Sequence, residues 1–298
     1  MRRLAVRIAS TLLALLVLLA VFADLIASDA PILARYRGSW LVLPVVTEPA
    51  LLARIDRAEL EQGGVIWAPL RASPTRDAAT PQSGTQRWAQ TVHGARSVVV
   101  TTLGVLALAL ALGVPIGALA GRGNFADALL SRAVELTGAL PSLILVAALQ
   151  AGRVAPSWLA FVVILGALRG VEVARLVRGE VLRVSGTEFV LAARALGGSP
   201  LRVVVRHVLP HVWGPVIVNA TFGAAAVVAL EAALSFVGLG LPDPVPSWGR
   251  LLGQVGSAGA WPLLGPAAGI LGTTVCLYVV ADFLDDRVSA RRGAASRV

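Results

Sequence analysis

The chain has 298 residues, of which 56% are hydrophobic and 14% are charged, and its mean hydropathy is +0.78. This balance excludes an ordinary soluble domain and indicates an integral membrane protein. Every basic side chain is arginine, and the net charge of +9 lacks the interleaved aromatic residues of a nucleic-acid surface. One cysteine, and three histidines that are scattered or lie beside arginines, exclude an intrachain disulfide framework and disfavour a metal site.

Six segments are long and apolar enough to cross a bilayer, whose hydrocarbon core requires about 20 helical residues. They cover residues 4–26, 97–121, 134–152, 154–168, 212–238 and a stretch within 251–281. Only a turn containing Gly152 and Pro156 separates the third from the fourth, so these two form a tight helical hairpin. We therefore predict an all-α membrane protein with six transmembrane helices.

The predicted spans divide the chain into four parts. These are an N-terminal transmembrane anchor at 1–27, an extracytoplasmic loop at 28–93, a core with five transmembrane helices at 94–284, and a cytoplasmic tail at 285–298. The N-terminus also has features of a secretory signal peptide, but its apolar run exceeds the usual length of about 7 to 15 residues, which favours an uncleaved anchor. Within the loop we predict a helix at 49–62 and an irregular connection at 71–90. The loop is either a solvated connection or part of a docking surface for an external partner.

Arginines supply the test of topology. Seven lie between Arg169 and Arg206, in a segment that the six spans place inside, whereas the two short turns placed outside hold only Arg153 and Arg250. Cytoplasmic loops of membrane proteins carry an excess of basic residues. The distribution therefore predicts that both termini are cytoplasmic.

The basic segment 187–210, TEFVLAARALGGSPLRVVVRHVLP, lies between two uncharged spans. Thr187 can cap the start of a short helix, and Gly197-Gly198 can end it because glycine accepts left-handed geometry. Ser199-Pro200 has the signature of a second helix start, and Pro210 is expected to end that helix. The pattern predicts two short helices outside the membrane, joined by a sharp break.

The first of these helices has a small apolar face. Its members recur at helical spacing: Phe189, Ala192, Ala193 and Leu196. Such a face fits the groove of a partner protein, and it equally fits the lipid interface, where arginines attract anionic head groups. Periodicity alone leaves both interpretations open.

This segment resembles the EAA motif of binding-protein-dependent ABC transporter permeases. The matching positions are Ala192, Ala193, Gly197 and Leu209-Pro210, with further similarity at 140–142, 174–180, 231–240 and 246–249. The downstream stretches are similar to the dipeptide and oligopeptide subgroup. Leu191 stands where the family motif has glutamate, and residues 86–97 depart from the signature that precedes the second span in the subgroup.

The resemblance implies a type I ABC importer permease fold, an inner-membrane location and a peptide-type solute. It implies contact with the ATPase through cytoplasmic coupling helices, at Glu188, Phe189, Ala192, Ala193, Arg194, Leu196, Gly197, Leu209 and Pro210. The implied partners are two ATPase subunits, a second related permease and an extracytoplasmic solute-binding protein. The chain has no GxxxxGK[ST] phosphate loop, so it is expected to be a transport subunit without enzymatic activity or cofactor. The alternative is an ATP-independent secondary transporter or a channel subunit.

Glu231 is an acidic residue well inside a predicted span, which marks it as a candidate for the pathway or its gate, together with Ser235 and Phe236. The other interpretation places Glu231 near enough to the outer surface to be hydrated. Trp213, Trp248 and Trp261 are predicted to anchor span ends at the membrane interface. A final set, Gly113, Pro115 and Gly117, permits a kink or close helix packing, and we favour packing.

Overall fold

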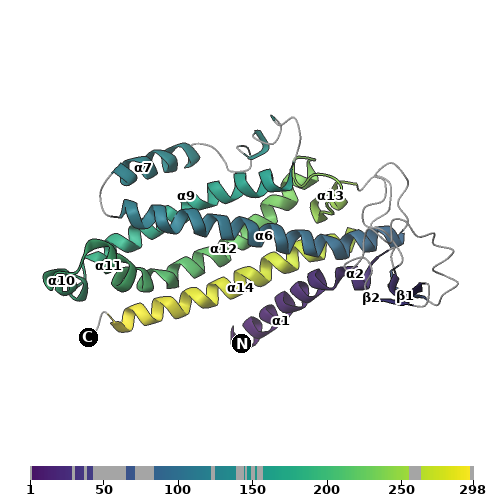
Figure 1. The fold of residues 1–298 in the computed structure, drawn as a ribbon, viewed down its shortest axis with the longest axis horizontal. Coiled ribbons are helices and arrows are strands. Elements are labelled where there is room, and N and C mark those ends of the chain that lie inside the picture. The colour runs from purple at the N-terminus through teal and green to yellow at the C-terminus, as the bar shows by residue number, and fades with distance from the viewer. Residues whose placement is uncertain are drawn as a thin grey trace. The chain divides into compact units, whose positions relative to one another are not determined.

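The computed structural model describes residues 2–28, 31–36, 39–42, 65–70, 84–121, 125–138, 144, 146–148, 152, 157–254 and 263–295. Its elements in chain order (Figure 1) are α1 (Arg2–Val21), α2 (Ala23–Ile26), β1 (Pro31–Tyr36), β2 (Ser39–Val42), β3 (Val65–Trp67), α6 (Gly84–Ala120), α7 (Phe125–Gly138), α9 (Trp158–Ser185), α10 (Glu188–Ala195), α11 (Pro200–Val203), the π-helical turn η1 (Val204–Val208), α12 (Leu209–Phe236), α13 (Trp248–Gly253) and α14 (Leu264–Ala295). The described residues are mostly helical.

Four helical stretches among the described residues are long and apolar enough to cross a membrane. They are Arg2–Val21, Gly84–Ala120, Pro200–Phe236 and Leu264–Ala290. These stretches contain the first, second and fifth predicted spans nearly in full and much of the sixth. The 37-residue α6 begins well before its predicted span. Four of the six predicted spans are therefore recovered among the described residues, with shifted boundaries: α1 ends before its predicted end, whereas α6 is longer than predicted.

The predicted helical hairpin is only partly within the described residues. The 28-residue α9 contains most of the predicted fourth span, but it continues to Ser185, far beyond the predicted end at Leu168. The C-terminal half of α9 carries several charged residues, and one of them, Arg178, donates a hydrogen bond to Asp127 of α7. That hydrogen bond raises the pKa of the Arg178 guanidinium. Most of the third span, 134–152, lies outside the described residues, although α7 covers its beginning.

The segment between α2 and α6 corrects the all-α prediction. Here β1 pairs antiparallel with both β2 and β3, giving a three-stranded sheet of order β2-β1-β3. The β1–β2 register places Arg35 opposite Trp40, and the Arg35 guanidinium lies 5.8 Å from the Trp40 ring centroid. Apolar and aromatic residues on both sides of Gly38 carried this strand signal, but the mixed composition of the long loop obscured it.

Two further predictions concern this segment. The predicted helix at 49–62 lies outside the described residues. The predicted connection at 71–90 is wrong at its end, because α6 begins at Gly84. The loop is joined to the helices by backbone hydrogen bonds from Ser28 N to Leu70 O and from Leu70 N to Ile26 O, of 3.1 and 3.0 Å. These bonds tie the chain after β3 to the end of α2.

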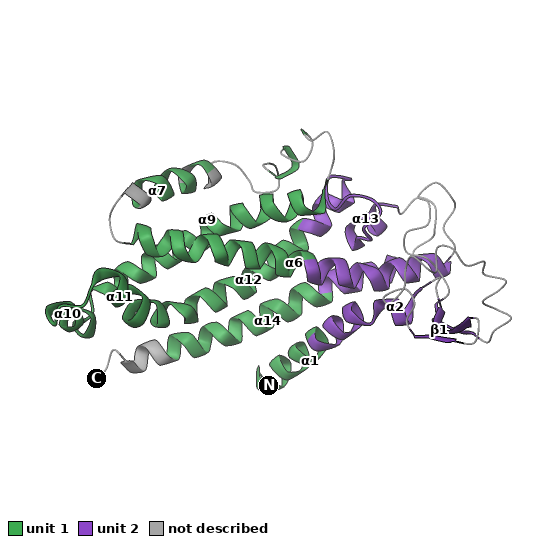
Figure 2. Cartoon of the chain, in the orientation of Figure 1, with its two compact units in different colours: residues 1–13, 101–230, 272–298 green, residues 14–100, 231–271 purple. Residues whose placement is uncertain are grey.

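The chain forms two compact units, coloured separately in Figure 2. Unit 1 consists of residues 1–13, 101–230 and 272–298, and unit 2 of residues 14–100 and 231–271. Long helices contribute to both units, so the units are discontinuous in sequence. The four-part division of the chain by membrane topology stays a prediction.

Within unit 1, α6 packs on α9 through a row of glycines. A Cβ on Gly113 would lie 2.6 Å from Val173 Cβ, and one on Gly121 would lie 2.6 Å from Val181 Cγ1. Between them, a Cβ on Gly117 would meet Val177 Cβ at 2.7 Å. Real Cβ atoms do not approach so closely, and small residues at every fourth position let helix backbones come together. The packing role predicted for Gly113 and Gly117 is confirmed.

Candidate functional site

The first candidate site is the elbow, residues 187–210, in unit 1. Its first helix, α10, ends at two glycines as predicted. Gly197 has a φ of +80°, its N–H donates to Arg194 O, and the Gly198 N–H donates to Ala193 O. This pair of bonds is a Schellman motif, which requires a left-handed residue where glycine carries no steric cost. The break after α10 is therefore fixed by local sequence.

The predicted side-chain caps are not formed. Thr187 and Ser199 both occupy N-cap positions with extended backbone, but neither side chain bonds to its helix. The Thr187 hydroxyl instead donates to Val184 O, at 2.6 Å, in the last turn of α9. The short loop between α9 and α10 explains this difference, because it places the hydroxyl beside the last carbonyls of the preceding helix. Pro200 does lie at the first turn of α11, as predicted.

Pro210 does not end the second helix, which corrects the prediction. The chain passes from α11 through η1 into α12 without a break, and Pro210 is the second residue of α12. Just before it, the Leu209 N–H donates to Val204 O, five residues earlier. A π-helical turn holds one extra residue and relieves the clash of a proline ring with the preceding turn. The elbow is thus continuous with α12.

The apolar residues of the elbow divide into a buried set and an exposed set. Val190 is 0% exposed, whereas Phe189 is 46% and Leu196 is 88% exposed. Ala192 is also exposed, and the partly buried Ala193 packs against the core beneath. Of the predicted face, three residues therefore remain on the surface and one turns inward. The charged Glu188 and Arg194 are exposed.

Beneath the elbow lies a core made almost entirely of valine. Its buried members are Ala109, Ala118, Val173, Val177, Val181, Val184, Val190, Val203, Val204, Val208, Val212 and Val216. They come from α6, α9, α10, α11, η1 and α12, and Leu209 packs against them. Valine has one strongly preferred rotamer in a helix, so such a core deforms little. This core therefore joins the elbow to three long helices, α6, α9 and α12.

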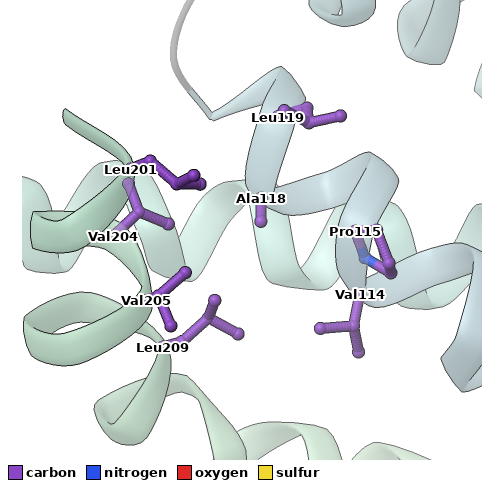
Figure 3. Close-up of a pocket in the computed structure, with 8 residues that line it drawn as sticks. All are labelled: Val114, Pro115, Ala118, Leu119, Leu201, Val204, Val205 and Leu209. Carbon is purple, nitrogen blue, oxygen red and sulfur yellow. The ribbon is translucent and has the colours of Figure 1, made fainter.

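An apolar groove of about 290 Å³ adjoins this core. In Figure 3 the side chains of α6 face those of α11, η1 and α12 across it. Its lining residues are Val114, Pro115, Ala118, Leu119, Leu201, Val204, Val205 and Leu209. None of these side chains can donate or accept a hydrogen bond. The groove has no group with which to recognise a polar solute.

The second candidate site surrounds Glu231, in unit 2. Glu231 is 1% exposed, and its Oε1 accepts hydrogen bonds from Ser235 Oγ at 2.7 Å and from Ser247 Oγ at 2.8 Å. Its Oε2 is buried and makes no hydrogen bond among the described residues. Glu231 and Ser235 are therefore hydrogen-bonded to each other, and the burial of Glu231 contradicts the interpretation that it is hydrated. The pathway or gating role of Glu231, Ser235 and Phe236 stays a prediction. Phe236 is 54% exposed and lies outside this hydrogen-bonded group.

Trp248 corrects the prediction of an interfacial anchor. It is 2% exposed, and its Nε1 donates to Thr91 O at 2.8 Å. The indole fills the space left by two glycines, since a Cβ on Gly94 or Gly269 would lie 2.6 and 2.9 Å from ring atoms. Trp213, by contrast, is 45% exposed, and Trp261 lies outside the described residues.

Sequence reasoning missed the roles of Ser247, Trp248 and Arg250, and the partners of Ser247 and Trp248 are 16 and 157 residues away in the chain. Arg250 donates to the Asp243 carboxylate and to Leu241 O, and Ser247 caps α13 through the Arg250 N–H. The available signal was Ser247 directly before a helical stretch, which is a capping pattern. In the part of the chain that the structure describes, no cluster of histidine, cysteine, aspartate or glutamate could hold a metal ion.

These features agree with a known family. A model of the family described as "Binding-protein-dependent transport system inner membrane component" matches residues 113–292, more than half of the chain. The chain belongs to this family. It is a multi-pass inner-membrane component of an ABC transport system, and it is expected to work with ATPase and binding-protein partners. The family comprises transport components rather than enzymes. Membership in an ABC transport family excludes the other interpretation of the sequence, an ATP-independent secondary transporter or channel subunit.

Two relatives with known names are similar to this chain over about 70% of its length. The oligopeptide transport system permease protein OppC of Bacillus subtilis (strain 168) is 32% identical over 217 residues, which cover 71% of this chain and 70% of the relative. The dipeptide transport system permease protein DppC of Alkalihalophilus pseudofirmus is 31% identical over 216 residues, covering 71% of each. The predicted resemblance to this subgroup is therefore confirmed.

A solved structure shows the same fold. The chain matches a structure of inward-facing conformations of the MetNI methionine ABC transporter with a TM-score of 0.56 and 23% identity. The match covers 70% of this chain and 99% of that one. At this identity the likeness establishes the fold alone.

Proposed function

We propose that this chain forms half of the pathway of an ATP-driven importer of peptides, and that the elbow is where its ATPase docks. The observation that carries the proposal is the exposed apolar face of α10, with Phe189 46% and Leu196 88% exposed, on a core that reaches three long helices. Peptide transport is supported by the names of the relatives. The lipid interpretation is less favoured, since family membership supplies a partner for this face.

The proposal assigns the coupling role to residues of the elbow. Phe189, Ala192 and Leu196 supply the exposed apolar contacts, and Glu188 and Arg194 supply exposed charges around them. Four further residues shape or hold the elbow: Ala193, Gly197, Leu209 and Pro210. Coupling requires a contact that differs between transporter states, because a contact equal in both shifts nothing.

We further propose that two ATPases and a second related permease complete the transporter, and that both termini are cytoplasmic. The arginine distribution supports this orientation. So do ion pairs between the two ends of the chain: Arg2 approaches Asp282 at 3.6 Å and also pairs with Asp286. The start of α1 thus pairs with residues near the end of α14, which supports placing both termini on one side of the bilayer.

The test is Leu196→Asp in the assembled transporter, reconstituted in vesicles with its ATPases and binding protein. Leu196 is 88% exposed, so the change leaves folding of the permease intact, but it introduces an unpaired charge into an apolar contact. We expect peptide uptake and stimulated ATPase activity to fall by about tenfold or more, which is about 1.4 kcal/mol. Leu196→Met is the matched control and should retain activity. Normal coupled uptake in Leu196→Asp would overturn the docking assignment.

A further inference from the structure

The Glu231 site is a polar connection between a transmembrane helix and the segment that follows it. A carboxyl group inside a span is expensive, and it persists where its hydrogen bonds are used. Here the hydroxyls of Ser235 and Ser247 both donate to Glu231 Oε1, at 2.7 and 2.8 Å. Ser235 is one turn further along α12, whereas Ser247 is 16 residues away in the chain. The second bond therefore holds the return segment, residues 238–253, onto α12.

Backbone packing follows the same path. The return segment lies against α12 at three glycines, where a Cβ would collide with the helix: Gly240 against Ser235, Gly249 against Ala232 and Gly253 against Phe236. The Leu241 N–H adds a bond of 3.2 Å to Ser235 Oγ. Glycine allows this approach, but glycine alone does not hold it. The hydrogen bonds centred on Glu231 supply the specific attachment.

The far side of the return segment holds other helices of unit 2. Directly after Ser247, Trp248 donates to Thr91 O of α6 and packs against Gly269 of α14. Arg250 braces the segment internally through Asp243 and Leu241 O. Two adjacent residues therefore connect the return segment to different helices: Ser247 bonds to α12, and Trp248 contacts α6 and α14. A change at Glu231 alters how these helices are joined.

We propose that Glu231, Ser235 and Ser247 form a clasp that keeps the return segment closed on α12 in the resting transporter, with Glu231 as its positioning residue. The inference rests on the proposed function, because the helix that carries Glu231 is the helix that begins in the elbow. The clasp favours one state, so its loss shifts the resting equilibrium toward the state that hydrolyses ATP. The binding protein then stimulates ATP hydrolysis by a smaller factor.

The experiment compares Glu231→Leu with Glu231→Gln in the full transporter, reconstituted in vesicles with its ATPases. Leucine removes the acceptor of both serine hydroxyls at similar size, whereas glutamine keeps a carbonyl oxygen that can accept both. We expect the ratio of stimulated to basal ATPase activity, measured with and without the binding protein and peptide, to fall about tenfold in Glu231→Leu. Glu231→Gln should stay near the wild-type ratio. A lower amount of folded transporter would reduce both activities together and leave the ratio unchanged.

Amide hydrogen exchange on the permease provides a second readout that needs no ATP. Exchange at the Leu241 and Arg250 amides, which bond to the two serine hydroxyls, should accelerate in Glu231→Leu and not in Glu231→Gln. Unchanged exchange in Glu231→Leu would overturn the clasp itself. Faster exchange with an unchanged ATPase ratio would overturn its control of the resting state. If the wild-type transporter lacks stimulated ATPase activity altogether, the proposed function fails, and the exchange result still decides whether the clasp exists.

Discussion

The elbow and the clasp use hydrophobic and polar groups in opposite ways. The elbow exposes apolar side chains, with Leu196 88% exposed, and Phe189 is only partly covered, by the ring of His211. The clasp buries polar ones, with Glu231 1% exposed, and supplies partners for them within the same chain. An exposed apolar surface is typical of an interaction site. The second arrangement holds the return segment on α12, although Glu231 Oε2 makes no hydrogen bond among the described residues.

The largest effect separates two glycines. Gly249 contacts the Ala232 backbone, whereas nothing lies within 4 Å of a Cβ on Gly197. We expect Gly249→Ala to destabilise the permease by about 3 kcal/mol, since a backbone neighbour cannot step aside. Gly197→Ala should cost about 1 to 2 kcal/mol through its φ of +80°. Thermal unfolding of the two purified variants checks the order, and equal losses would contradict the close approach at Gly249.

Adjacent residues of α10 provide the next contrast. Val190→Ala should cost about 2 kcal/mol, because Val190 is 0% exposed and its removal leaves a cavity in the valine core. Leu191→Ala should change stability by less than about 0.5 kcal/mol, because Leu191 is 51% exposed. Unfolding midpoints in denaturant measure both. A larger loss at Leu191 would show that the elbow faces the other way.

Two serines at helix starts sharpen the comparison. Ser247 accepts from the Arg250 N–H and donates to Glu231, whereas the Ser199 side chain caps nothing. Ser247→Ala should therefore cost about 1 to 2 kcal/mol, and Ser199→Ala only a few tenths. The paired measurement is thermal stability in the same detergent. If both alanine variants lose equal stability, the capping assignment fails.

The smallest effect is expected for Leu191→Glu. This change restores the glutamate of the family motif on an exposed position, where a side chain can extend into solvent. Stability should stay within about 0.5 kcal/mol of wild type, and coupled peptide uptake should be retained. Uptake in vesicles checks this, and its loss would show that the partner of this elbow requires an apolar residue there.

Local signals made much of the elbow predictable. Gly197 ends α10 and Pro200 opens α11 because each residue restricts its own backbone. The division of α10 into Val190 inside and Phe189 outside could not be read from sequence, since both faces are apolar. Pro210 does not end the helix as predicted, because the π-helical turn before it accommodates the proline ring. No local sequence pattern predicts such a turn.

The clasp was less predictable because its partners are far apart. Glu231 drew notice as an acid in a span, but its second bond comes from Ser247. Trp248 was assigned to the membrane interface on its residue type and position alone. Its burial depends on two glycines, Gly94 and Gly269, on other helices. Contacts of this kind follow from tertiary packing, which composition and periodicity do not encode.

The π-helical turn at Val204–Val208 also fixes the angle, about the helix axis, between the elbow before it and α12 after it. Removing one residue there, as in a deletion of Val205, would convert the turn to ordinary α-helix. Each residue of such a helix advances by about 100°, so the elbow would rotate by roughly that amount about the axis of α12. The inserted residue therefore sets the direction in which the exposed apolar side chains of α10 point.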